Sequence, residues 1–232
     1  TLLPLACGGF DFVLADLGVS SMQIDNPARG FSFRADGPLD LRLDPTNGQS
    51  ASELLLCVTR HRLRDLLTDN SDEPYAVELA AALQGQYVET TVQLADLVRA
   101  AMALVFKRSM PEDERAAETK KALQRTFQAL RIEVNGELEV LERTMPASIR
   151  ALAVGGRIVV MSYHSLEDRI TKQALVAAAN SSAPIELPIE LPEHAPVLRL
   201  LVKGAEAATA EEIAINPRAA SVRLRAAEKI RR

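Results

Sequence analysis

An aspartate stands near the start of the chain, at the point where a mostly apolar segment ends. Residues 10–15 follow Gly8-Gly9, and Asp16 comes directly after them, ahead of Gly18 and the pair Ser20-Ser21. The length of this segment and its β-branched and aromatic content predict a buried parallel strand. Ligands bind beyond the carboxyl ends of strands in open α/β sheets, so a carboxylate here can orient a ligand amine or a reacting base. The same local pattern also fits an aspartate that only caps a turn.

A second group of residues combines cations with aromatic rings. It consists of Arg29-Gly30-Phe31-Ser32-Phe33-Arg34 and the following Leu39-Asp40-Leu41-Arg42-Leu43-Asp44. Arginine pairs with phosphate, and phenylalanine stacks on an unpaired base. The alternative is a solvated loop that two buried phenylalanine rings hold in place.

A third candidate is the polar segment Ser162-Tyr163-His164-Ser165-Leu166-Glu167-Asp168-Arg169. It follows a second apolar strand, residues 155–162, so His164 should lie at the same sheet edge as Asp16 and can contact a substrate there. Ser165 and Asp168 are interpreted as helix caps, because Ser165 opens a capping-box pattern. A hydrolase with a Ser-His-Asp triad is a poor fit, since no G-x-S-x-G nucleophile turn is present.

A fourth candidate lies on a predicted helix of residues 112–134. Arg125, Gln128 and Arg131 share a polar face opposite Phe127 and Leu130. Such a face can bind RNA, but a charged, solvent-facing helix surface explains the same spacing.

Composition restricts the class of protein. The 232 residues are 47% hydrophobic and 25% charged, which suits one large or two small globular domains. The formal net charge of -4 argues against a broad, non-specific nucleic-acid binder but leaves room for a local basic patch. Cys7 and Cys57 form neither a metal-binding spacing nor a disulfide framework, so we expect no metal and a reducing cytosol. No apolar stretch approaches the roughly 20 residues of a membrane span.

The remaining patterns place these groups on strands, helices and loops. Residues 17–49 are expected to form a long ordered loop, and residues 50–135 a mostly helical subdomain that opens with a Ser50-to-Glu53 capping box. Strands are also predicted at 197–202 and 221–226, a short helix at 210–215, and a stiff, proline-rich linker at 181–196. Strands that alternate with helices around a helical insertion predict an α/β sheet with a grafted helical subdomain.

Taken together, these segments resemble the RsmH family, also called MraW. The matching stretches fall in the family's order and span nearly the whole chain, which makes the set specific although each stretch is short. They are Asp16-Leu17-Gly18-Val19-Ser20-Ser21, Gln23, Arg29-Gly30-Phe31-Ser32-Phe33, Gly37-Pro38-Leu39-Asp40, Arg125-Thr126-Phe127-Gln128-Ala129-Leu130-Arg131, His164-Ser165-Leu166-Glu167-Asp168-Arg169 and Asn216-Pro217-Arg218.

The resemblance implies a class I, Rossmann-like methyltransferase sheet that lacks its first strands, with residues 1–49 and 136–232 in the α/β domain and 50–135 in an all-helical insertion. It implies transfer of a methyl group from S-adenosyl-L-methionine to N4 of a cytidine in the 16S rRNA of the small ribosomal subunit, in the cytoplasm. Asp16 and Gln23 match cofactor contacts, and Asp16, Ser20 and Ser21 are the candidates for catalysis. The RNA-binding candidates are Arg29, Phe31, Phe33, Arg34, Arg125, Arg131 and His164.

Three departures from the family pattern qualify this expectation. The family's Gly-rich cofactor loop and ribose-binding acid have no counterpart, so we expect a chain that begins inside a larger domain and is inactive by itself. Lys121-Ala122-Leu123-Gln124 stands where the family has His-Pro-Ala-x, and Ser71-Asp72-Glu73-Pro74 where it has Gly-Glu-Glu. The alternatives are a non-catalytic RNA- or ribosome-binding relative and a methyltransferase for another substrate, such as DNA cytosine.

Overall fold

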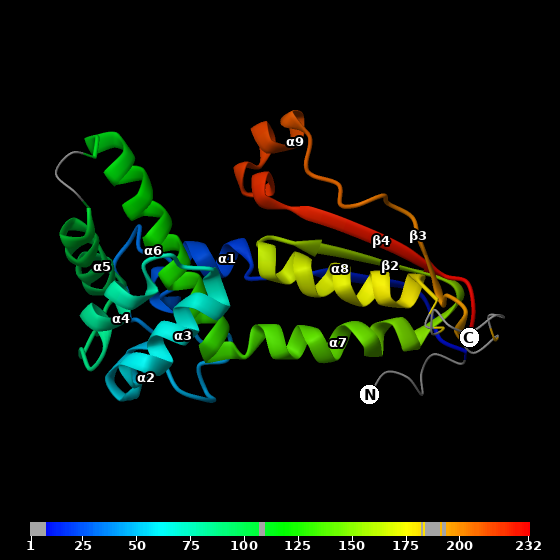
Figure 1. Ribbon diagram of the computed structural model, residues 1–232, viewed down its shortest axis with the longest axis horizontal. Helices are drawn as coiled ribbons and strands as arrows, with labels where there is room; N and C mark the ends of the chain where they lie inside the picture. Colours follow the sequence, from blue (N-terminus) through cyan, green and yellow to red (C-terminus); the bar gives the residue numbers. More distant parts are fainter. Residues whose placement is uncertain (1–7, 107–109, 182, 184–190, 192–193) are drawn as a thin grey trace. The chain divides into compact units, whose positions relative to one another are not determined.

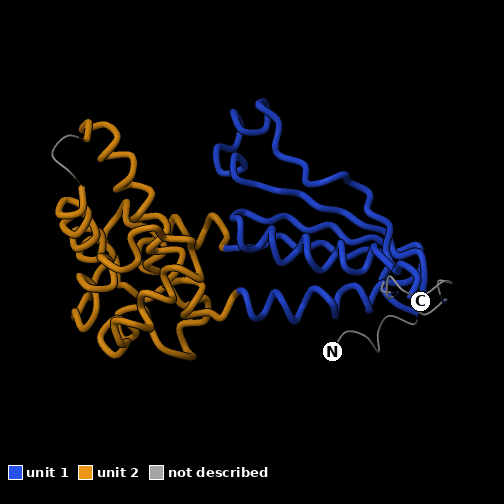
Figure 2. The backbone as a smooth tube through the Cα atoms, in the orientation of Figure 1, with its two compact units in different colours: residues 1–18, 138–232 blue, residues 19–137 orange. Residues whose placement is uncertain are grey.

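The computed structural model describes residues 8–106, 110–181, 183, 191 and 194–232. The chain divides into two compact units, which Figure 2 colours separately. We call residues 1–18 and 138–232 the α/β unit and residues 19–137 the helical unit. Most of the predicted linker at 181–196 lies outside the described residues.

The α/β unit contains a mixed four-stranded sheet in the order β1-β2-β4-β3. Its strands are β1 (Phe10–Asp16), β2 (Leu152–Ser162), β3 (Leu198–Leu200) and β4 (Arg223–Lys229). β1 pairs with β2 in parallel, whereas β4 is antiparallel to both β2 and β3. The predicted α/β fold class is confirmed, and β2 begins three residues earlier than the sequence indicated.

Two helices, α7 (Glu137–Ala151) and α8 (Ser165–Ala179), run alongside these strands (Figure 1). Met145 of α7 and Leu175 of α8 share a core with Ile158 and Val160 of β2. Strand side chains alternate between the two faces of a sheet, so Phe12 and Leu14 point away from this core and are 55% and 57% exposed. A short helix, α9 (Ala210–Ile215), has the predicted bounds, and a 3-10 turn, η4 (Pro217–Ser221), precedes β4.

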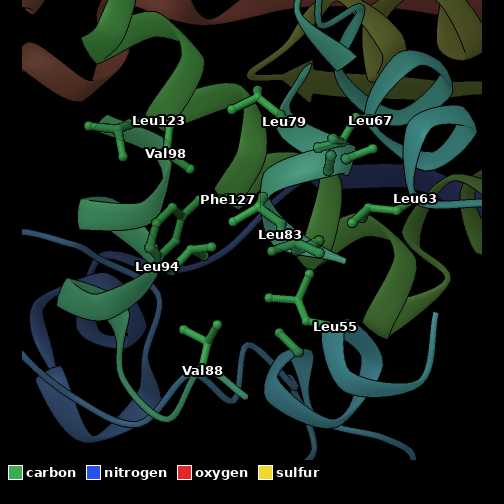
Figure 3. Packing of buried hydrophobic residues seen from close by; sticks show 14 of the residues in the cluster. Leu55, Leu63, Leu67, Leu79, Leu83, Val88, Leu94, Val98, Leu123 and Phe127 are labelled. Atoms are coloured by element: carbon green, nitrogen blue, oxygen red, sulfur yellow. The ribbon is translucent and has the colours of Figure 1, made fainter. Parts of the chain in front are cut away.

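The helical unit is built around one apolar cluster, part of which Figure 3 shows. Its elements are α1 (Ser21–Asp25), the 3-10 turn η2 (Pro27–Arg29), α2 (Ala51–Cys57), α3 (Arg60–Ser71), α4 (Ala76–Leu83), α5 (Thr91–Val105) and α6 (Glu112–Asn135). The predicted capping box at Ser50 is present, and Thr90 opens α5 with a second box. Gly136 ends α6 in the left-handed conformation, at φ 59°, and so separates α6 from the helix that follows it.

The segment 19–49 differs most from its prediction. It contains α1 and η2, and it belongs to the helical unit, whereas the sequence grouped residues 1–49 with the α/β domain. Leu39 and Leu41 explain this placement, because both are buried in the helical core at 1% exposure. Their burial could not be read from a segment without helical periodicity.

Candidate functional site

Asp16 and Tyr163 lie side by side at the carboxyl edge of the two parallel strands. The register pairs Asp16 with Met161, so Tyr163 follows β2 at the level where β1 ends. The Tyr163 hydroxyl donates a hydrogen bond of 2.8 Å to Oδ1 of Asp16. Asp16 is exposed, and within the described part of the chain its carboxylate accepts no further hydrogen bond. The contact orients one carboxylate oxygen and leaves the other accessible to a ligand.

The state of Tyr163 is set by its surroundings. Burial, the hydrogen bond to Asp16 and the negative charges of Asp16 and Glu167 together raise the pKa of Tyr163 to about 12. The phenol therefore stays protonated at neutral pH and remains a hydrogen-bond donor. Sequence reasoning missed Tyr163, although its position directly after a strand's carboxyl end was an available signal.

The buried carboxylate of Glu167 holds the backbone at this edge of the sheet. Glu167 is 4% exposed, and its Oε2 accepts hydrogen bonds from the backbone N–H groups of Tyr163 at 2.8 Å and His164 at 3.3 Å. Its Oε1 lies 3.2 Å from His164 Nε2, at an angle that does not form a hydrogen bond. Glu167 thus fixes the backbone that carries the Tyr163 side chain.

His164, rather than Ser165, is the N-cap of α8, so the predicted capping pattern is wrong by one residue. His164 has extended dihedrals, and its Nδ1 accepts the Glu167 N–H at 3.5 Å, with Glu167 completing the box. The cap depends on where the chain leaves β2, which the local sequence does not define. Asp168 is not a cap either: it binds Arg225 of β4 through contacts of 2.7 and 2.8 Å.

Ser20 and Gln23 bind each other in the helical unit. Ser20 Oγ accepts from the Gln23 N–H at 3.3 Å, and Gln23 Oε1 accepts from the Ser20 N–H at 2.9 Å, which forms the capping box of α1. This leaves the Gln23 amide nitrogen for a ligand, while Ser21 is exposed in the first turn. The S-x-x-Q spacing was a sufficient signal for this helix, and the sequence reading overlooked it.

The arginine-phenylalanine segment is anchored through its side chains. Arg29 donates from Nη2 to the carbonyl oxygens of Arg42 at 3.0 Å and Leu43 at 2.8 Å. Its guanidinium lies 5.7 Å from the centre of the Phe31 ring. Phe33 packs on Phe127 with ring centres 5.3 Å apart, and both Phe31 and Phe33 are partly buried against the core of the helical unit.

Arg34 differs from its neighbour Arg29. Arg34 is exposed, and its side chain forms no hydrogen bond or ion pair with the described residues. It is therefore the arginine of this segment that is available to a phosphate.

The polar face of α6 is an internal network rather than a solvated surface. Arg131 pairs with Glu137 through contacts of 2.9 and 3.0 Å, and Gln128 donates to the Asn70 carbonyl at 3.1 Å. Arg125 lies 3.9 Å from Glu73, whose side chain is fully buried. Burial raises the pKa of Glu73, against the opposing effects of the Tyr75 N–H and the Arg125 charge. The two arginines of α6 that were predicted to bind RNA thus have carboxylate partners within the helical unit.

Two features are absent from the described residues. These residues contain no group of three His, Cys, Asp or Glu side chains arranged to hold a metal ion. They also contain no helix with the length and apolar character needed to cross a membrane.

Comparison with known proteins decides between the possible families. The model of the MraW methylase family matches residues 4–230. The chain belongs to this family. The resemblance seen in the ordered motifs is therefore confirmed, as is the expectation of a methyltransferase.

Several curated relatives carry the name ribosomal RNA small subunit methyltransferase H. The protein of Clavibacter michiganensis is 48% identical over 98% of this chain and 70% of its own length. The relative from Beutenbergia cavernae is 48% identical over 97% of this chain and 66% of its own length. The Leifsonia xyli protein is 49% identical over 94% of this chain, again covering 66% of the relative. The chain thus spans about two thirds of the length of these relatives.

Proposed function

We propose that this chain serves methyl transfer to small-subunit ribosomal RNA, from S-adenosyl-L-methionine to N4 of a cytidine in 16S rRNA, in the bacterial cytoplasm. The observation that carries the proposal is the oriented, accessible Asp16 carboxylate at the sheet edge of a member of the MraW methylase family. In this proposal the α/β unit is the methyltransferase domain and the helical unit is the insertion that serves the RNA.

The residues at this edge fit the proposed cofactor. S-adenosyl-L-methionine carries an ammonium group, a sulfonium centre and an adenine amine, all of which favour an acceptor or a negative charge. Asp16 supplies an ionisable acceptor with one oxygen held by Tyr163. Gly18, at φ 81°, lets the backbone turn away from the strand without a side chain filling the space near Tyr163. When bound, the cofactor supplies the methyl group.

The protein's part in the reaction is chiefly positioning. The N4 amine of cytosine is conjugated with its ring and is a poor nucleophile, so the base must be held with its lone pair in line with the methyl carbon. An acceptor close to N4 takes up the proton as the bond forms. We assign this neighbourhood to the turn from Asp16 to Ser21, with Asp16 mainly a cofactor ligand and the Ser20 and Ser21 hydroxyls as candidate acceptors. The target base must also be unstacked to reach such a site.

Substitution of Asp16 in the full-length protein tests the proposal. Removing a charge-assisted hydrogen bond is worth roughly 1.5–3 kcal/mol, so Asp16→Ala should weaken S-adenosyl-L-methionine binding roughly 10- to 150-fold. Calorimetric titration measures this affinity. Asp11→Ala, which removes an exposed aspartate from the same strand, is the matched control and should bind normally. Unchanged affinity in Asp16→Ala would remove Asp16 from the cofactor site.

The substrate is tested separately with labelled cofactor. Small ribosomal subunits should accept the label in preference to DNA when both are present. Label found mainly on DNA would identify a DNA cytosine methyltransferase. A protein that binds small subunits without transferring label would be the non-catalytic relative.

A further inference from the structure

A pocket in the helical unit is separate from every residue assigned to cofactor or catalysis. It has a volume of about 600 Å³ and is lined by side chains of α5 and α6 together with Phe33 and Phe106. Small-molecule sites usually measure about 300–1,000 Å³, so the pocket is large enough for a single nucleotide.

The lining combines an apolar wall with cations. Phe33 and Phe106 contribute aromatic surface, while Arg99, Arg115 and Lys120 contribute positive charge. Both rings are held in place, because Phe33 packs on Phe127 and Phe106 meets Tyr75 edge-on at 5.9 Å between ring centres.

The three cations differ in how far they are already neutralised. Arg99 forms an ion pair of 2.7 Å with Asp96. Lys120 is exposed and has no ion-pair partner among the residues that the structure describes. The Nε atom of Arg115 is shielded from solvent and has no hydrogen-bond partner among the described residues. Glu112 is the one acidic side chain in the lining, so the pocket is locally cationic in a chain of net charge -4.

We propose that this pocket binds one unpaired nucleotide of the RNA substrate, with the base against Phe33 and Phe106 and the adjoining phosphate near Arg115 and Lys120. The inference rests on the proposed function for the identity of the RNA. Stacking on aromatic rings combined with phosphate pairing is the usual way in which proteins hold single-stranded RNA. The pocket would thus hold a nucleotide at a distinct site in addition to the reacting base.

Three variants of the full-length protein separate the two halves of this recognition. Arg115→Gln with Lys120→Gln removes charge and leaves the apolar wall. Ala116→Trp fills the pocket from an exposed position that lines it, and leaves the charge unchanged. The matched control, Arg60→Gln with Lys172→Gln, removes two exposed cations that do not line the pocket. Thermal unfolding shows whether each variant is folded.

Binding is measured by fluorescence anisotropy of a labelled, short single-stranded oligoribonucleotide at several salt concentrations. The charge variant should lower the slope of log affinity against log salt by about 0.7, the contribution of one single-strand phosphate contact. Ala116→Trp should lower affinity about tenfold with an unchanged slope, because it removes base stacking. The control should behave like the unsubstituted protein.

Other outcomes overturn the inference, and they can be distinguished from failure of the proposed function. Equal binding by all variants, or equal competition by poly-glutamate, would show that the pocket does not hold a nucleotide. If those same variants still methylate small subunits normally, the proposed function stands without the pocket. If the pocket variants lose RNA binding but the unsubstituted protein transfers no methyl group, the pocket inference stands without the proposed function.

Discussion

The two units of this chain bury their apolar side chains to different extents. Among the described residues, the buried apolar cluster of the helical unit has 23 members, whereas that of the α/β unit has nine. The α/β unit instead leaves Phe12 and Leu14 of β1 more than half exposed, on the strand that ends at Asp16. The helical unit builds its core from one continuous segment of the chain. The α/β unit instead leaves apolar side chains exposed on the strand that leads to Asp16.

The largest expected effect compares the same substitution in the two units. Leu130→Ala in α6 removes a fully buried side chain and should lower the free energy of unfolding by about 2–5 kcal/mol. Leu14→Ala on β1 removes a side chain that is 57% exposed and should cost less than about 0.5 kcal/mol. Urea unfolding measures both values. A Leu14→Ala cost as large as that of Leu130→Ala would show that the exposed face of β1 is covered in solution.

Substitutions of Arg29 and Arg34 should have different effects, the first on stability and the second on RNA binding. Arg29→Ala loses two hydrogen bonds to backbone carbonyls and the Phe31 contact, and should lower the free energy of unfolding by about 1–3 kcal/mol. Arg34→Ala should leave stability unchanged while reducing methylation of small subunits, with a smaller loss at low salt. Methylation assays and chemical unfolding of both variants test this. Reduced cofactor affinity in Arg34→Ala would instead place the segment beside the cofactor.

The buried Glu73 should make the helical unit sensitive to pH. Because burial raises the pKa of Glu73 above its ordinary value of 4.5, its contribution to stability is full below 4.5 and is lost as pH rises through the folded-state pKa. Glu73→Gln should therefore stabilise the protein at pH 7, by on the order of 1 kcal/mol, and the gain should shrink in mild acid. Thermal unfolding across this range measures it, with the exposed Glu78→Gln as control. A destabilised Glu73→Gln at pH 7 would mean that pairing with Arg125 outweighs burial.

The smallest expected effect concerns the start of α8 in the α/β unit. His164→Ala removes the observed N-cap and should lower stability by roughly 0.5–1 kcal/mol. Ser165→Ala changes a first-turn residue that is not the cap and should have almost no effect. Equal losses in both variants would contradict the capping geometry described for His164.

Sequence patterns defined the elements whose signals are local. The apolar run before Asp16 and the box at Ser50 each involve residues a few positions apart, so composition and spacing identify them. The ordered motifs also identified the family. The same reading missed the α1 box at Ser20 and moved the α8 cap by one residue, because short helices next to turns have little periodicity.

The partners of the site residues were decided only by the tertiary structure. The contacts of Tyr163 with Asp16 and of Arg225 with Asp168 join residues far apart along the chain. Strand register and helix packing set these pairs, and a single sequence records neither. The same holds for Arg125 and Arg131, whose spacing is helical but whose carboxylate partners come from the α3–α4 connection and from the start of α7. The sequence by itself determined the family, through its ordered motifs, and the strands and helices whose residues lie close together along the chain. The fold determined which side chains are already paired within the protein and which remain available to a ligand, because that depends on contacts between distant segments.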